Sequence, residues 1–108
     1  MTVTSLDAVA REQLEKAAAG SGRAAETVYG GHDKTLRQTV IALASGAELT
    51  EHRNPGEATV LVLSGHVLLR SGDGAWEGRD SDLIVVPDAR HSLLAVKEST
   101  VLLTVAKH

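Results

Sequence analysis

The sequence predicts an all-β domain with one α-helix at its N-terminus, and three observations carry that prediction. Short runs rich in valine, leucine, isoleucine and threonine recur from residue 23 onward, and such runs favour strands. Turn-forming residues separate them, as at Ser45-Gly46 and Asn54-Pro55-Gly56. No helical periodicity lies between the runs, which disfavours an alternating α/β sheet. Many short strands joined by tight turns are typical of a sandwich or a barrel.

The expected helix covers residues 5–19. Thr4 followed by Asp7 resembles a capping box at its start. Gly20-Ser21-Gly22 ends it, because glycine readily adopts the left-handed conformation that closes helices. The apolar stripe is narrow, so we expect the helix to pack on the outside of the β domain. The stripe consists of Leu6, Val9, Ala10, Leu14, Ala17 and Ala18.

Nine short strands are expected after the helix, with Ser64-Gly65 and Lys97-Glu98 interpreted as turns that separate neighbouring strands. The chain of 108 residues fits one domain, in which 1–22 form the helix and its connection and 23–108 form the β domain. The expected strands are 24–29, 35–44, 47–52, 58–64, 66–70, 75–78, 82–86, 90–97 and 99–106.

Composition excludes several classes of function. A formal net charge of −3 and an aromatic content of 2% provide neither a basic surface nor stacking platforms, so we expect no nucleic-acid partner. Without cysteine the chain has no disulfide, thiolate metal site or cysteine nucleophile. The apolar runs are too short to span a bilayer, and the first residues lack a signal-peptide pattern. We therefore expect a cytoplasmic protein with no membrane partner.

Three of the expected strands are apolar at successive positions, in residues 60–63, 83–86 and 101–103. One set of alternate side chains can fill a barrel, and the other set still needs cover. A second subunit can supply that cover, so we expect a homodimer. The alternative is that the N-terminal helix alone covers the outer set.

Histidine is the residue type with the most chemical potential in this chain. His32 in a glycine-rich connection, His66 after a hairpin glycine and His108 are expected to be solvated. His52 and His91 instead border strongly apolar strands. They are either functional or simply partly buried side chains at strand ends.

Two segments around these histidines resemble the two motifs of the cupin superfamily. Residues 46–65 resemble the first motif, which places a glycine before a His-x-His pair, then a glutamate and a second glycine. Residues 81–91, with Pro87 near the end and His91 last, are similar to the second motif. The chain most resembles small single-domain cupins of the type-2, RmlC-like kind found in actinobacteria. The resemblance implies a double-stranded β-helix, that is, a jelly-roll barrel.

The resemblance also implies a metal site of three histidines and one glutamate inside the barrel, suited to Fe, Mn, Ni, Zn or Cu. His52 and His91 stand at two of these positions, while Asn54 replaces the second histidine and Ala58 replaces the glutamate. Glu57 is adjacent, but one step along a strand turns a side chain to the other face. The metal motif is therefore eroded, and His52, Asn54 and His91 are the candidate ligands.

These features support three hypotheses about function. The first is a cupin that binds a small molecule, a weakly held divalent transition metal, or both, inside the barrel, with Gln38, Val60 and Val62 as candidate ligand-binding residues. The second is a metal-dependent enzyme of dioxygenase or isomerase type that uses His52 and His91. The third is a regulatory or interaction protein. The sequence leaves two alternatives open: the protein binds a divalent transition metal, or it has no cofactor.

Overall fold

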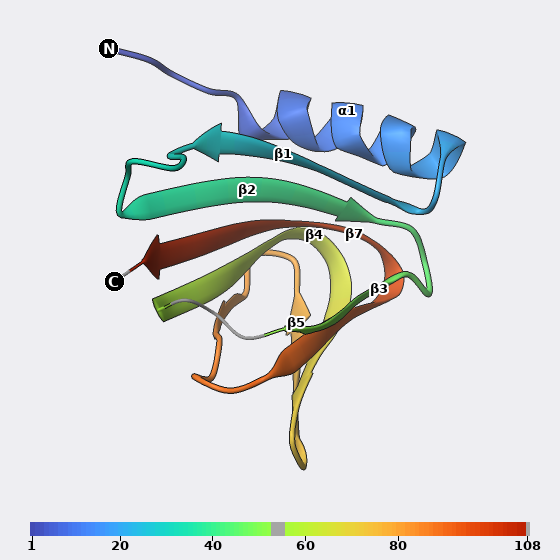
Figure 1. The fold of residues 1–108 in the computed structure, drawn as a ribbon. Coiled ribbons are helices and arrows are strands. Elements are labelled where there is room, and N and C mark those ends of the chain that lie inside the picture. The colour runs from blue at the N-terminus through green and yellow to red at the C-terminus, as the bar shows by residue number, and fades with distance from the viewer. Residues whose placement is uncertain (53–55, 108) are drawn as a thin grey trace.

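In the computed structural model, one helix precedes seven strands (Figure 1). The structure describes residues 1–52 and 56–107, and only the backbone of residues 51, 52 and 107. The elements are α1 (Leu6–Ala19), β1 (Arg23–Tyr29), β2 (Leu36–Leu43), β3 (Glu48–His52), β4 (Gly56–Ser71), β5 (Gly74–Arg79), β6 (Leu83–Val85) and β7 (His91–Lys107). This confirms the prediction of a mostly β chain with one N-terminal helix.

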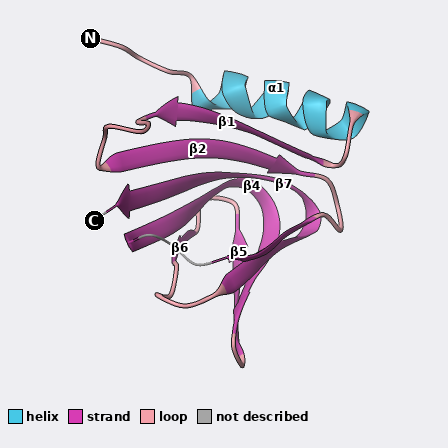
Figure 2. Cartoon of the chain, in the orientation of Figure 1, coloured by secondary structure: helices cyan, strands magenta, loops and turns pink. Residues whose placement is uncertain are grey.

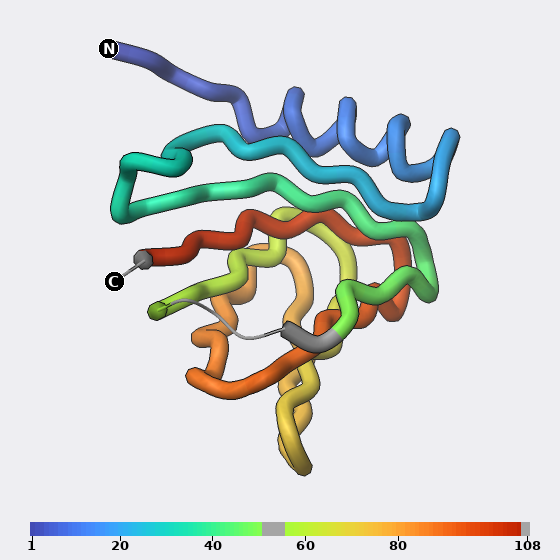
Figure 3. The backbone as a smooth tube through the Cα atoms, in the orientation of Figure 1, coloured from blue at the N-terminus to red at the C-terminus, as the bar shows by residue number. Residues whose placement is uncertain are grey.

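The strands form one antiparallel sheet that folds over on itself. Its main path runs β1-β2-β7-β4-β5, while β3 pairs with β7 and β6 pairs with β4. The long strands β4 and β7 lie side by side and curve together through the whole domain, so that their two halves belong to different walls (Figure 3). The strand pairs enclose an apolar interior between these walls.

The two predicted breaks at Ser64-Gly65 and Lys97-Glu98 are wrong, because β4 and β7 each continue through them. Gly65 has φ +112°, and the β4–β7 register shifts between residues 62 and 67. The Ser99 hydroxyl accepts the His66 N–H at 3.0 Å and donates to the Lys97 carbonyl at 2.7 Å. The turn chemistry therefore forms a bulge, which bends both strands without ending them.

Helix α1 packs on the outer surface of β1 and β2, as expected from its narrow apolar stripe (Figure 1). Its N-cap is Ser5, whose hydroxyl accepts the Ala8 N–H at 3.2 Å, so the predicted cap at Thr4 is one residue too early. The Gly22 N–H donates to the Ala17 carbonyl at 2.9 Å, with Gly22 at φ +89°. Within the described part of the chain, no helix is long and apolar enough to cross a bilayer.

The apolar interior is built by alternate residues of the curved strands, which is what a period of two produces. In β4 the buried positions alternate with partly exposed ones along most of the strand. The interior residues are Ile41, Leu43, Ala58, Val60, Val62, Val67, Leu69, Ile84, Val86, Leu93, Ala95, Val101 and Val105.

The outer face of the sheet is covered at one end only. Val40, Leu102, Leu61 and Leu83 stand opposite one another across β2, β7, β4 and β6. Val40 is fully buried on the side where α1 packs, whereas Leu83 is 61% exposed and its neighbour Val85 is 75% exposed. Figure 2 shows β6 on the side of the domain away from α1. The helix therefore leaves the β6 end of this apolar face open.

Candidate functional site

His91 begins β7 and is only 4% exposed. Its Nδ1 lies 3.0 Å from the Ala89 carbonyl oxygen. Because a carbonyl oxygen can only accept, Nδ1 carries the proton, and Nε2 is then the basic nitrogen of the neutral ring. Metal-bound histidines commonly donate the other ring N–H to such a carbonyl. The hydrogen bond to Ala89 therefore fixes the His91 ring through Nδ1.

His91 also lines a small apolar cavity in the interior, with a volume of about 20 Å³. That volume is enough for about one water molecule or one ion and far below the roughly 300–1,000 Å³ of a typical ligand pocket. The other lining residues are Ile41, Leu49, Val60, Leu69, Leu93, Val101 and Leu103.

The backbone brings His52 and His91 together. His52 ends β3 and stands directly opposite His91 in the β3–β7 pair, after a register shift between Leu49 and His52. Opposed positions in an antiparallel pair have Cα atoms about 4.5–5.5 Å apart and share one face of the sheet. Two of the three predicted metal ligands are thus adjacent in the fold. The third, Asn54, lies outside the described residues.

The position that corresponds to the expected glutamate is apolar and faces the interior. Ala58 is 5% exposed and belongs to the core, while Glu57 is exposed on the other face. His32 is likewise exposed, in the connection between β1 and β2. Across the side chains that the structure describes, no three histidine, aspartate or glutamate residues gather as a metal centre. At position 58 the barrel wall therefore supplies a methyl group where the resemblance implies a carboxylate.

The three candidate ligand-binding residues lie on two different faces. Val60 lines the interior cavity and Val62 is fully buried in the core. Gln38 lies two residues before Val40 on β2 and therefore faces the same outer side of the sheet. Its amide Nε2 donates to the Thr104 hydroxyl at 3.2 Å. The structure thus brings Val60 and Val62 together and separates Gln38 from them.

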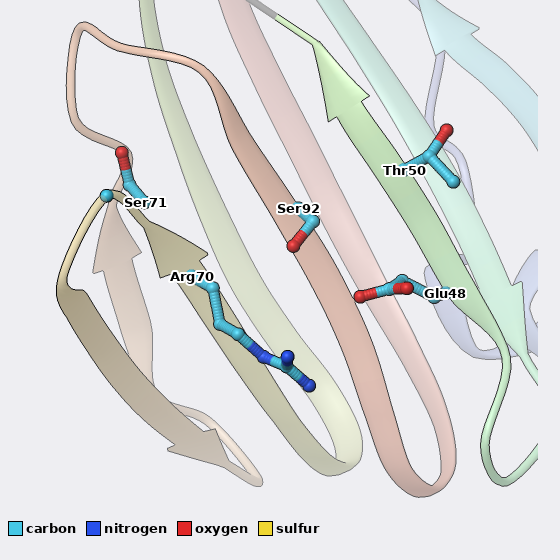
Figure 4. A pocket seen from close by; sticks show the side chains of 6 residues that line it. Glu48, Thr50, Arg70, Ser71 and Ser92 are labelled. Carbon is cyan, nitrogen blue, oxygen red and sulfur yellow. The ribbon is translucent and has the colours of Figure 1, made fainter.

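A larger hollow lies on the outer face of the same strands, with a volume of about 420 Å³ (Figure 4). We call it the outer hollow. The sequence did not lead us to expect it, although its polar residues alternate with Leu49, Leu69 and Leu93, which line the interior cavity. That alternation is the signal that could have indicated a polar face. The outer hollow is lined by Glu48, Thr50, Arg70, Ser71, Gly72 and Ser92.

Comparisons with known proteins identify structures with a similar fold. No family model matches the chain, and no curated protein matches it. A conserved Streptococcus pyogenes protein of unknown function is 31% identical, with a TM-score of 0.73 over 80% of this chain and 75% of that one. An RmlC-like cupin from Desulfovibrio desulfuricans is 24% identical, with a TM-score of 0.70 over 80% of this chain and 83% of that one.

A mutant of salicylate 1,2-dioxygenase from Pseudoaminobacter salicylatoxidans, solved with gentisate, is 25% identical with a TM-score of 0.72. The match covers 93% of this chain but only 31% of the dioxygenase. The curved antiparallel sheet of this chain agrees with these structural similarities. The chain has the fold of cupin superfamily proteins.

Proposed function

We propose that this cupin holds a divalent transition metal weakly at the edge of its barrel, with His52 and His91 as the protein ligands. The observation that carries the proposal is the direct pairing of these two positions in the β3–β7 ladder. The Ala89 carbonyl orients the ring of His91 through Nδ1, so that Nε2 is the nitrogen that would bind the metal. The remaining coordination positions would take water or the polar atoms of a small molecule.

The affinity of such a site is limited by what surrounds it. Ala58 supplies no carboxylate from the wall where the resemblance expects one. Two imidazoles without an anionic ligand leave the charge of the ion uncompensated in an apolar interior, which disfavours tight binding. We therefore expect an ion that exchanges with solvent rather than one that is built permanently into the fold.

A calorimetric titration with Ni²⁺ on tag-free protein tests the proposal. We expect one site in the wild type and a loss of affinity of about tenfold or more in His91→Ala, because one of only two imidazoles is removed. His66→Ala is the matched control. The expectation that His66 is solvated was wrong, since its side chain is only 16% exposed and its Nε2 lies 2.9 Å from Glu77 Oε1, elsewhere in the fold. Equal weakening in the two variants, or no binding by the wild type, would contradict the proposal.

A second candidate function is a metal-dependent dioxygenase, favoured by the 25% identity to the salicylate dioxygenase over 93% of this chain. The interior cavity that His91 lines has room for about one water, so an aromatic acid would have to bind at the barrel edge. The test is oxygen consumption by Fe²⁺-loaded protein with gentisate or salicylate. Consumption that depends on His91 supports this candidate, and its absence with both compounds excludes these substrates.

We further propose a homodimer in which a second copy covers the open end of the outer apolar face. Leu83 and Val85 are the most exposed residues of that face, beside the half-buried Leu61 and Leu102. Contiguous apolar surface next to a buried row is typical of an interface.

The expected result is a dimer mass for the wild type by light scattering and a monomer for Leu83→Glu/Val85→Glu. Val96→Glu, at another apolar position that is 46% exposed, should remain dimeric; a monomeric wild type would overturn the proposal.

A further inference from the structure

Arg70 and Glu48 approach the outer hollow from opposite sides of β7. Arg70 stands opposite Ser92, and Glu48 stands opposite Leu94 on the other side of that strand. Two strand spacings and a two-residue offset put the Cα atoms of Arg70 and Glu48 about 12 Å apart. Figure 4 shows the two side chains directed toward β7 from opposite sides of that strand. Among the described side chains, neither of the two takes part in an ion pair.

The surface of the outer hollow between Arg70 and Glu48 is polar, and hydrogen bonds hold the surrounding backbone in place. The Ser92 hydroxyl is half-buried and makes no hydrogen bond to any residue in the described ranges. The Ser71 hydroxyl donates to the Arg90 carbonyl at 2.8 Å, which fixes the end of β4 against the start of β7. The Glu48 carbonyl accepts a hydrogen bond from Arg23 Nη1 at 3.1 Å. The backbone is therefore anchored, while the Ser92 hydroxyl is available to a bound molecule.

We propose that the outer hollow binds a small zwitterion that carries one carboxylate and one ammonium group, that is, an amino acid. The guanidinium of Arg70 can take the carboxylate with two parallel hydrogen bonds, and Ser92 can donate a third. The carboxylate of Glu48 pairs with the ammonium group. The hollow of about 420 Å³ is large enough, since ligand pockets span roughly 300–1,000 Å³. A single-charge ligand would leave either Arg70 or Glu48 uncompensated.

This site is separate from the proposed metal site, although the two share strands. Leu49, Leu69 and His91 face the interior cavity, whereas Glu48, Arg70 and Ser92 line the opposite face. Binding at the outer hollow needs no metal. The experiment is therefore performed in the presence of a chelator, so that its failure leaves the metal proposal untouched.

The probes are four compounds that differ only in charge pattern: L-2-aminobutyrate, 4-aminobutyrate, butyrate and butylamine. The measurement is the chemical-shift change of backbone amides around Ser92 in ¹⁵N-labelled full-length protein. We expect at least one of the two zwitterions to saturate these shifts with a Kd about tenfold or more below that of butyrate and butylamine. The two zwitterions differ in charge separation, so their ratio measures the gap between Arg70 and Glu48.

Charge-removing variants assign the effect to these two side chains. Arg70→Gln and Glu48→Gln are each expected to raise the Kd of the preferred zwitterion by about tenfold. Arg79→Gln is the matched control, because Arg79 is an exposed arginine on β5 outside the outer hollow. The proposal is overturned if no probe gives a saturable shift, if zwitterions bind no better than the single-charge compounds, or if Arg79→Gln weakens binding as much as Arg70→Gln.

Discussion

Gly65→Ala is expected to lower the free energy of unfolding by about 2–5 kcal/mol, because a strained backbone conformation and a steric overlap add together. Gly65 has φ +112°, a conformation that costs a residue with a Cβ about 1–2 kcal/mol. A Cβ there would also collide with the Ser99 hydroxyl oxygen and lie 2.6 Å from the Glu98 carbonyl oxygen. Backbone must shift to relieve that overlap, which adds about 1–3 kcal/mol.

Gly46→Ala is the matched control for this prediction. Gly46 has φ +84°, and a Cβ built on it meets nothing within 4 Å. Gly46→Ala therefore measures only the cost of placing a residue with a Cβ at positive φ, which is about 1–2 kcal/mol, without any steric overlap. Urea unfolding of the two variants measures the difference. Equal destabilisation would show that the bulge at Gly65 can open to accept a side chain, and that β4 and β7 are less tightly joined there than the structure indicates.

Ala58→Glu is expected to raise the affinity for Ni²⁺ or Zn²⁺ by about tenfold or more, because an inward carboxylate adds an anionic third ligand. Ala58 is buried in the barrel wall at the position where cupins with an intact motif are expected to carry glutamate. Without metal the same change should destabilise the fold by about 2 kcal/mol or more, since a carboxyl group is then buried without a partner. Thermal denaturation with and without metal measures both effects.

Two controls separate coordination from general effects of size and charge. Ala58→Gln introduces a side chain of similar size that is a poor ligand, so it should destabilise without raising metal affinity. Glu57→Gln removes the exposed neighbouring carboxylate and should change neither quantity. If Ala58→Glu and Ala58→Gln bind metal equally, the eroded position does not face the proposed ion.

The sequence predicted the fold well because period-two patterning and turn residues are local signals. All seven strands begin or end within a few residues of the predicted ranges. The errors occurred where one local signal has two structural outcomes. Ser64-Gly65 has the chemistry of a turn, but Gly65 forms a bulge because β7 pairs with both halves of β4. That pairing joins segments that are far apart in the sequence, so the residues around Gly65 alone do not predict it.

The candidate site was predictable only in part. The pairing of His52 with His91 follows from motif positions, and the inward orientation of Ala58 instead of Glu57 follows from strand alternation. The volume of the interior cavity depends on how side chains from four strands, β2, β3, β4 and β7, fill the barrel, which no local pattern specifies. The outer hollow depends on which residues become neighbours across β3, β7 and β4.

The most direct test of the central claim is a long-range ¹H–¹⁵N spectrum of the histidine side chains during a Zn²⁺ titration of tag-free protein. We expect the resonances of Nε2 of His91 and of one nitrogen of His52 to shift together and to saturate at one equivalent of Zn²⁺. Nδ1 of His91 should keep its proton and its hydrogen bond to Ala89. His32 and His66 should not respond at the same concentration. A spectrum in which the His91 resonances are unchanged at saturating Zn²⁺, or shift without those of His52, would contradict metal binding by this pair of histidines.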